Sequence, residues 1–320
     1  MAITLTDIKT EFGAYYMPQG QGEKDLVQKL YQKSETEELF STRIITGTRY
    51  QGAESLIDRL IQPFQKEFTP IGNVDFKPII IEMDHMKVDF KEYLSDLEES
   101  WLGFLADNGE KTVDNYPFVR WLMENHILPQ VTEDDELNEV FLGIKAAPTP
   151  GTAGAAGTAR NGVRKIINDF INAGRISPIS TGTLETSPED FVTQIEDFHA
   201  QVTERYRGVS MQLAMNKTLA LRYDRGYLAK YGRNMNFKDN PRREVAFTNI
   251  EVVGVASMAS SSKIWMTPKQ NAIRLINGVN PKWEIGQFSE RQVSIFADWY
   301  KALGFLIPEI VFTNDQDLDD

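Results

Sequence analysis

The chain has 320 residues, a formal net charge of −12 and no cysteine, and 41% of its residues are hydrophobic. The absence of thiols excludes disulfides and thiolate metal sites, and the acidic balance argues against a general nucleic-acid-binding surface. No apolar run approaches the roughly 18–20 residues of a membrane-spanning helix, and the start lacks the pattern of a signal peptide. We therefore expect a soluble protein, cytosolic at synthesis, built as two lobes or as a body with extensions.

The first 90 residues predict an arm, a helix and an extended region. Met1–Gly22 is weakly patterned and rich in glycine, whereas Glu23–Leu39 carries apolar residues on one helical face. From Phe40 to Phe90, β-like runs such as Ile79–Ile81 alternate with turn residues, and a helix-like insert at Glu54–Ile61 interrupts them. Such a region has little to pack on within its own chain, so we expect a partner to stabilise it.

The next stretch predicts three helices around a low-complexity connector. They are Val88–Ala106, Tyr116–Gly143 and Val163–Ala173. Pro129 should kink or split the longest of them, because proline removes a helix hydrogen bond and clashes with the preceding turn. The connector, Ala146–Gly162, is composed mainly of glycine, alanine, proline and threonine.

Residues 187–276 predict a mixed α/β unit. Ser187 and Pro188 begin a helix whose apolar stripe continues to Tyr206, and a short strand at Val209–Met215 leads to a second helix, Asn216–Tyr231. Strands are then expected at Val245–Phe247, Ile250–Val253 and Lys263–Met266. Val293–Leu306 has an ambiguous period, Ile307–Thr313 predicts a last strand, and an acidic tail follows at Asp315–Asp320.

The glycine-rich connector is one candidate binding site. Gly151, Gly154 and Gly157 precede a helix, where backbone N–H groups can hold a phosphate. Their spacing lacks the Lys-Ser/Thr pair of a nucleotide loop and does not follow a strand as a dinucleotide fingerprint does. A flexible or partner-bound connector is the favoured interpretation.

The other candidate sites are clusters of ionisable residues. Glu82, Asp84 and His85 are too few for a metal site and indicate a solvated strand face. His126 and His199 are expected to be ordinary core or surface histidines. The run Glu133–Glu136 points to different helix faces and predicts a solvated face or a helix start. Arg233, Lys238, Arg242 and Arg243 form a basic cluster typical of ordinary surface charge. We therefore predict no catalytic, cofactor-binding or metal-binding residues, and no enzyme.

The order of these elements resembles the major capsid proteins of tailed phages with the Hong Kong 97-type fold. The stretches that carry the resemblance are Val209–Asn216, Asn249–Val253 and Lys263–Met266, followed by Arg291–Trp299 and Gly304–Phe312. Two further stretches, Pro117–Trp121 and Pro148–Gly154, are similar to capsid proteins from phages of Bacteroidetes-type hosts.

The resemblance implies an α+β chain with five regions. They are an N-terminal arm and helix at 1–39, an extended β loop at 40–90, a peripheral domain with the long helix at 91–174, a mixed α/β axial domain at 175–290, and C-terminal strands at 291–320. Such subunits form hexamers and pentamers of an icosahedral head around double-stranded DNA, without sequence-specific DNA contact, cofactor or membrane. The resemblance places the protein in the virion, and in the host cytoplasm during assembly, with portal, scaffold and decoration proteins as further partners.

Three alternatives remain open at this point. An encapsulin-like nanocompartment shell has the same fold. Another virion or tail subunit would also lack catalytic residues, although a tail tube should be dominated by strands with few long helices. An enzyme that holds a phosphorylated ligand at the glycine-rich connector is the third alternative.

Overall fold

The computed structural model describes residues 35–57, 59–93, 122–232, 244–259, 261–278, 282–288 and 292–319. The predictions for the N-terminal arm, for most of the helix at Glu23–Leu39 and for the basic cluster at 233–243 lie outside these residues. Of that helix only a short 3₁₀ turn, Glu37–Leu39, is described. No described helix is both long enough and apolar enough to cross a membrane.

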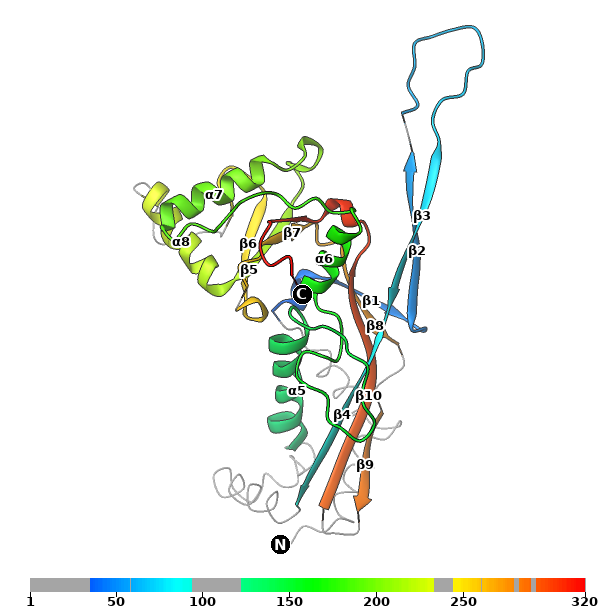
Figure 1. Ribbon diagram of the computed structural model, residues 1–320, viewed down its shortest axis with the longest axis vertical. Coiled ribbons are helices and arrows are strands. Elements are labelled where there is room, and N and C mark those ends of the chain that lie inside the picture. The colour runs from blue at the N-terminus through cyan, green and yellow to red at the C-terminus, as the bar shows by residue number, and fades with distance from the viewer. Residues whose placement is uncertain are drawn as a thin grey trace, which may run out of the picture.

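A five-stranded sheet runs along the lower half of the molecule (Figure 1). Its path is β1 (Ser41–Ile45), β8 (Ala272–Asn277), β10 (Gln292–Phe305) and β4 (Asp84–Tyr93), with β9 (Lys282–Phe288) also paired to β10. Strand β10 pairs with β4 along one side, and with β9 and then β8 along the other. The ambiguous segment 293–306 is therefore a strand, and it holds the sheet together.

Two helical segments predicted near this sheet are wrong within the described residues. Residues 88–93 belong to β4, where Met86, Val88 and Phe90 alternate with exposed Lys87, Asp89 and Lys91. The predicted helix-like insert at 54–61 overlaps β2 (Arg49–Ile57), which pairs residue by residue with β3 (Val74–Glu82). In both cases the hydrogen bonds of a distant strand override a weak local helical pattern.

A four-stranded sheet forms the second half of the fold. Its order is β11 (Phe312–Thr313), β7 (Trp265–Thr267), β5 (Met211–Asn216) and β6 (Ile250–Val255). Helices α7 (Pro188–Ala200) and α8 (Lys217–Tyr231) pack against one another and bury the apolar face of this sheet. The predicted order of helix, strand, helix and strands is confirmed, and the Asn216 side chain caps α8 by accepting from the N–H of Leu219 at 2.7 Å.

Three predicted boundaries in this half are corrected. Helix α7 ends at Ala200, and only a short 3₁₀ turn, Glu204–Tyr206, follows. Residues 245–248 form a tight turn rather than a strand, closed by a hydrogen bond from the N–H of Thr248 to the Val245 carbonyl. The last strand is only β11, because Pro308–Ile310 form a 3₁₀ turn.

The long helix is described from Leu122 and continues through Pro129 without the expected split. It consists of a π turn at Met123–Ile127, helix α5 at Leu128–Asp134 and a second π turn at Asp135–Glu139. In a π turn each N–H reaches back five residues instead of four. This wider turn relieves the hydrogen-bond loss and the steric conflict that proline creates in a regular α-helix.

The C-terminal end of the long helix is hydrogen-bonded to the start of helix α6 (Val163–Asn172), a helix that was predicted. The N–H groups of Gly162, Val163 and Arg164 donate to the carbonyls of Gly143, Val140 and Phe141, at 2.8, 2.9 and 3.1 Å. The free donors of one helix thus satisfy the free acceptors of the other. A core cluster that includes Phe40, Trp265 and Phe305 lies between these helix ends and the two sheets.

The crossing of α7 and α8 generates the first prediction. A Cβ atom at Gly226 would lie 1.9 Å from the carbonyl oxygen of Pro188 and 2.8 Å from a Val192 methyl. Gly226→Ala should lower the free energy of unfolding by roughly 1–3 kcal/mol, because the helices must separate. Gly232→Ala is the matched control, since its new methyl would meet Leu228 atoms only at 3.7 Å. Equal midpoints for both variants in urea unfolding would contradict the close crossing.

Candidate assembly surface

Strands β2 and β3 form a two-stranded hairpin that projects beyond both sheets (Figure 1). Nine residue pairs join the strands, from Arg49 with Glu82 at the base to Ile57 with Val74 at the outer end. Pro78 lies inside β3, a position that proline tolerates because each strand of a two-stranded ribbon has a free edge. Extended structure is therefore confirmed at β1, β2, β3 and β4, but β1 and β4 belong to the five-stranded sheet and only β2 and β3 form the hairpin.

The hairpin exposes apolar side chains along β3 and in the loop at its outer end. In its loop, Phe64 is 93% exposed and Phe68 is 94% exposed, and Leu60, Ile61, Val74, Phe76 and Ile80 are also exposed. A single two-stranded hairpin is marginally stable in water, and so much adjoining apolar surface is typical of an interaction site. We call these seven residues the apolar hairpin surface. In the sequence, strand-forming and aromatic residues in a turn-rich stretch without local core partners indicated this surface.

The base of the hairpin is firmly attached to the body. Tyr50 and Ile81 pack against a small core formed by Met83, Ile273, Leu275 and Ala302. Arg43 on β1 donates a hydrogen bond to the Tyr50 hydroxyl at 2.9 Å, and Arg49 forms an ion pair with Glu82. The hairpin is thus presented by a rigid support.

A buried group of five charged residues fixes the segment that leads into β1. It comprises Glu37, Asp135, Arg160, Arg274 and Lys301, and we call it the charge cluster. Glu37 lies 2.6 Å from Arg274 and 3.5 Å from Arg160, and it also pairs with Lys301. Asp135 lies 2.7 Å from Arg160 and 2.8 Å from Lys301. The cluster joins the segment before β1, the long helix, the connector, β8 and β10.

The charge of each member of the charge cluster is compensated by the charges of the others. The Arg160 and Glu37 side chains are 0% and 1% exposed, so neither charge is solvated by bulk water. Burial alone would raise the pKa of Asp135, but the nearby charges of Arg160 and Lys301 outweigh it and hold that pKa below its ordinary value. No local sequence pattern predicted this cluster, because its members lie far apart in the chain. Glu37 and Lys301 are separated by 264 positions.

The carboxylate run at 133–136 is only half solvated, which corrects the prediction for it. Glu133 and Asp134 are exposed, whereas Asp135 belongs to the charge cluster and Glu136 is buried. Glu136 accepts hydrogen bonds from the N–H of Thr36 at 3.2 Å and from its hydroxyl at 2.6 Å. The π turn places these two neighbouring carboxylates against different partners.

The glycine-rich connector holds a carboxylate of its own chain rather than presenting its amides to a phosphate. Glu139 accepts hydrogen bonds from the N–H groups of Gly157, Ala159 and Arg160 at 2.8, 3.0 and 3.3 Å. A bound carboxylate uses the same donors that a phosphate would use. Of the three glycines of the predicted site, Gly157 therefore gives its N–H to Glu139, so this donor does not face a ligand.

Asp84 and the three histidines lie in different surroundings. His85 stacks on Tyr300 with ring centroids 4.3 Å apart, and its Nε2 lies 3.1 Å from the Asp298 carboxylate. Asp84 is buried and paired with Lys145 at 2.6 Å, so the predicted solvated face applies to Glu82 and His85 but not to Asp84. His126 is exposed, and partial burial lowers the pKa of His199.

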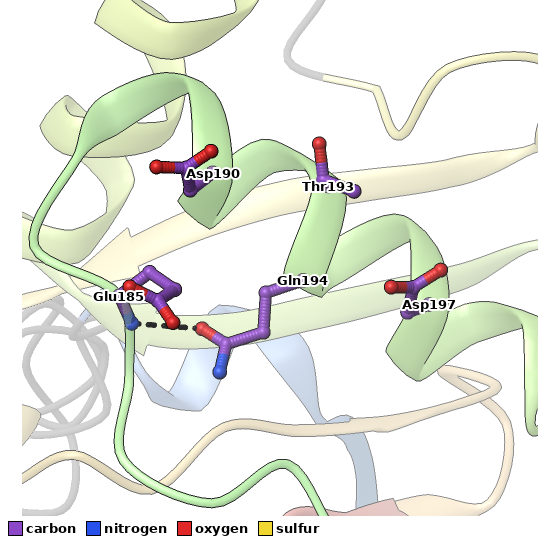
Figure 2. Close-up of a pocket in the computed structure, with 5 residues that line it drawn as sticks. All are labelled: Glu185, Asp190, Thr193, Gln194 and Asp197. Atoms are coloured by element: carbon purple, nitrogen blue, oxygen red, sulfur yellow. Dashed lines mark hydrogen bonds between the residues drawn. The ribbon is translucent and has the colours of Figure 1, made fainter.

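An open acidic depression of about 330 Å³ is lined by Glu185, Asp190, Thr193, Gln194 and Asp197. Figure 2 shows these five side chains. The Gln194 side-chain oxygen accepts from the Glu185 N–H at 2.9 Å, and its amide nitrogen donates to two carbonyls of the preceding loop. Within the described part of the chain, no three or more acidic or histidine side chains are placed to hold a metal ion. The Gln194 side chain therefore holds the preceding loop on α7.

The predicted acidic tail is partly built into the body. Asp315 accepts hydrogen bonds from the N–H groups of Thr181 and Gly182, both at 3.2 Å. Burial by itself would raise the pKa of Asp315, but hydrogen bonds outweigh it and hold that pKa well below its usual value. The fully buried Lys263 donates to the Asp317 carbonyl at 3.2 Å, which ties down the next turn of the tail.

Comparison with known proteins reveals relatives in structure only. The sequence matches no family model and no curated protein. The fold is similar to a chain of the satellite phage P4 procapsid that includes the size determination protein, with a TM-score of 0.61, 11% identity and 97% coverage of both chains. It is also similar to the capsid of the myovirus phage XM1, with a TM-score of 0.54, 11% identity, and coverage of 87% of this chain and 90% of that chain.

A third similar structure is a virus-like particle from Pyrococcus furiosus, with a TM-score of 0.51 and 9% identity. The match covers 91% of this chain and 96% of that chain. This chain has the Hong Kong 97-type capsid fold. The predicted fold class is therefore confirmed, although the boundaries of its five regions remain a prediction.

The charge cluster of this capsid fold generates the second prediction. Glu37→Gln should lower the free energy of unfolding by about 3–5 kcal/mol, because Arg274 and Lys301 lose a buried counter-charge. Glu35→Gln is the matched control, since Glu35 pairs with Lys217 on the exposed surface, where such pairs contribute about 0–1 kcal/mol. Denaturant unfolding of the two variants checks this, and equal losses would contradict a structural role for the cluster.

The third prediction concerns acid. Because the folded pKa of Asp135 is lowered, its contribution to stability is full above the unfolded pKa of about 3.9 and is lost as the pH falls through the folded value. The difference in unfolding free energy between the wild type and Asp135→Asn should therefore shrink between pH 5 and pH 2. The exposed Asp169→Asn, whose partner is Lys165, is the control and should give a small difference throughout. A constant difference for Asp135→Asn would refute the coupling.

Proposed function

We propose that this chain is the major shell-forming subunit of a tailed-phage capsid and has no catalytic activity. It assembles with copies of itself into hexamers and pentamers of an icosahedral head that encloses double-stranded DNA. The observation that carries the proposal is the apolar hairpin surface, projected from a body with a capsid fold.

The energetics of the hairpin favour a neighbouring subunit as its partner. Ordering each backbone residue costs about 1–2 kcal/mol, and the outer hairpin buries too little of its own apolar surface to offset that cost. Burial of Phe64 and Phe68 against another subunit supplies the missing stabilisation, because buried aromatic side chains dominate interface energetics. Within a shell, every subunit offers the same acceptor surface to the next.

The charge of the chain fits a container for a polyanion. A net charge of −12 disfavours tight adsorption of DNA, so the enclosed duplex is held by confinement and not by sequence-specific contacts. We place the protein in the virion, assembled in the host cytoplasm, with portal, scaffold and decoration proteins as further partners. Similarity to capsids of Bacteroidetes-infecting phages and the division into arm, loop, peripheral domain and axial domain belong to the same proposal.

A nanocompartment shell is the second candidate function. The similarity to a virus-like particle from Pyrococcus furiosus favours it, because that particle has the same fold. The two candidates differ in their content, since a phage head packages DNA. A tail tube subunit is less consistent with the described helices α5, α6, α7 and α8.

The fourth prediction tests assembly directly. The double variant Phe64→Ser with Phe68→Ser should raise the protein concentration needed for assembly by at least about 30-fold, the equivalent of one interface residue worth 2 kcal/mol. The body should keep its thermal midpoint, because both side chains are exposed in the isolated chain. Light scattering and negative-stain microscopy measure the particles.

The matched control for this experiment is Gln65→Ser, which changes a polar residue of the same loop. It should assemble like the wild type. Normal particles from the double variant would sink the proposed role of the hairpin, and a wild-type chain that stays monomeric would sink the shell proposal itself. Particles that contain protein cargo and no DNA in the native host would promote the nanocompartment candidate.

A further inference from the structure

The hairpin leaves the five-stranded sheet at a single residue. Strand β3 ends at Glu82 and β4 begins at Asp84, so the two are nearly one continuous strand interrupted at Met83. Met83 is buried, and its N–H donates to the Thr48 carbonyl at 2.8 Å. On the body side of this break the strand pairs with β10, and the last pair is Asp84 with Lys301. On the outer side, the described ladder pairs the strand with β2, from Glu82 with Arg49 to Val74 with Ile57.

Beyond the break, Ile81 and Gly304 face one another without strand pairing. Each lies three residues past the last pair, so an unbroken ladder would place them opposite each other. Gly304 pairs instead with Ile273 of β8 on its other side. A Cβ atom at Gly304 would lie 2.5 Å from Cδ1, 3.0 Å from Cγ1 and 3.2 Å from Cγ2 of Ile81. The Ile81 side chain therefore occupies the space that any other residue at position 304 would fill.

We propose that the contact between Ile81 and Gly304 sets the angle at which the hairpin leaves the body. Isoleucine is stiff at its first side-chain torsion, and Tyr50 on the paired strand packs in the same small core. A methyl group at position 304 therefore displaces β3 itself. Because the hairpin extends far beyond this contact, a small rotation at its base displaces the apolar hairpin surface by a larger distance.

The contact has two consequences, one for the hairpin angle in the single chain and one for the curvature of joined subunits. Only the second rests on the proposed function. If subunits join through the hairpin, the angle at its base determines the curvature of the joined subunits, and hence the size of the particle. The angle itself is a property of the single chain and can be measured without assembly.

The size of the effect follows from the geometry. Restoring an ordinary carbon–carbon contact requires about 1 Å of movement, at a point roughly 7 Å from the break. That is a rotation of about 8°, which moves the outer end of a nine-residue strand pair by roughly 3–5 Å. Spin labels resolve a change of this size.

The chain contains no cysteine, so a label pair is introduced cleanly at Gln65→Cys in the hairpin loop and Asp197→Cys on α7. The distance is measured by pulsed electron spin resonance on the full chain, diluted until subunits are unassembled. Gly304→Ala should shift the distance by several ångströms, and adding Ile81→Ala should restore it. Gly208→Ala, which would place a methyl in open space, is the control and should change nothing.

An unchanged distance in Gly304→Ala would overturn the proposal, because Ile81 would then have absorbed the methyl alone. A shift that Ile81→Ala does not reverse would also overturn it, since another contact would set the angle. If Gly304→Ala fails to fold, Ile81→Phe crowds the same contact from the hairpin side and should shift the distance with Gly304 intact.

Particle diameter, measured by cryo-electron microscopy, then tests the second consequence. A wild-type chain without particles defeats the proposed function and leaves the label result standing.

Discussion

The buried charge cluster is the constraint on which the rest of this structure depends. Glu37 reaches Arg160, Arg274 and Lys301 in a site that excludes bulk water, and Asp135 completes the arrangement. Buried ion pairs add little net stability over apolar packing, but an unpaired buried charge is strongly unfavourable. The cluster therefore acts mainly through specificity: only one placement of the long helix, the connector and strands β8 and β10 satisfies every charge.

That placement determines what the chain presents to its surroundings. The segment that carries Glu37 continues directly into β1 and then into the hairpin, so fixing Glu37 also fixes the start of the projecting arm. The break at Met83 returns the hairpin to the sheet. A rigid base and an uncovered apolar end are complementary features, because a preorganised arm loses less conformational entropy when it binds a neighbour.

Polar groups at the sites considered for ligands also form hydrogen bonds within the chain. Glu139 accepts from three N–H groups near the end of the connector, Gln194 bonds the loop beside the acidic depression, and Asp315 fastens the C-terminal residues. These three side chains hold loops of the chain in place, and Asp315 joins residues more than 130 positions apart. This use of polar groups is consistent with a subunit whose function is carried by shape and copy number.

The sequence by itself determined the elements whose signals are local. The α7, β5 and α8 succession, the Asn216 cap and the strand content of residues 41–53 and 74–82 follow from side-chain periodicity, capping and β propensity, which act within a few residues. Only the tertiary structure decided that residues 88–93 form a strand, that a π turn accommodates Pro129, and that Glu37 meets Lys301. Strand pairing and buried ion pairs join residues far apart in the chain, and their energies depend on burial that no local pattern encodes.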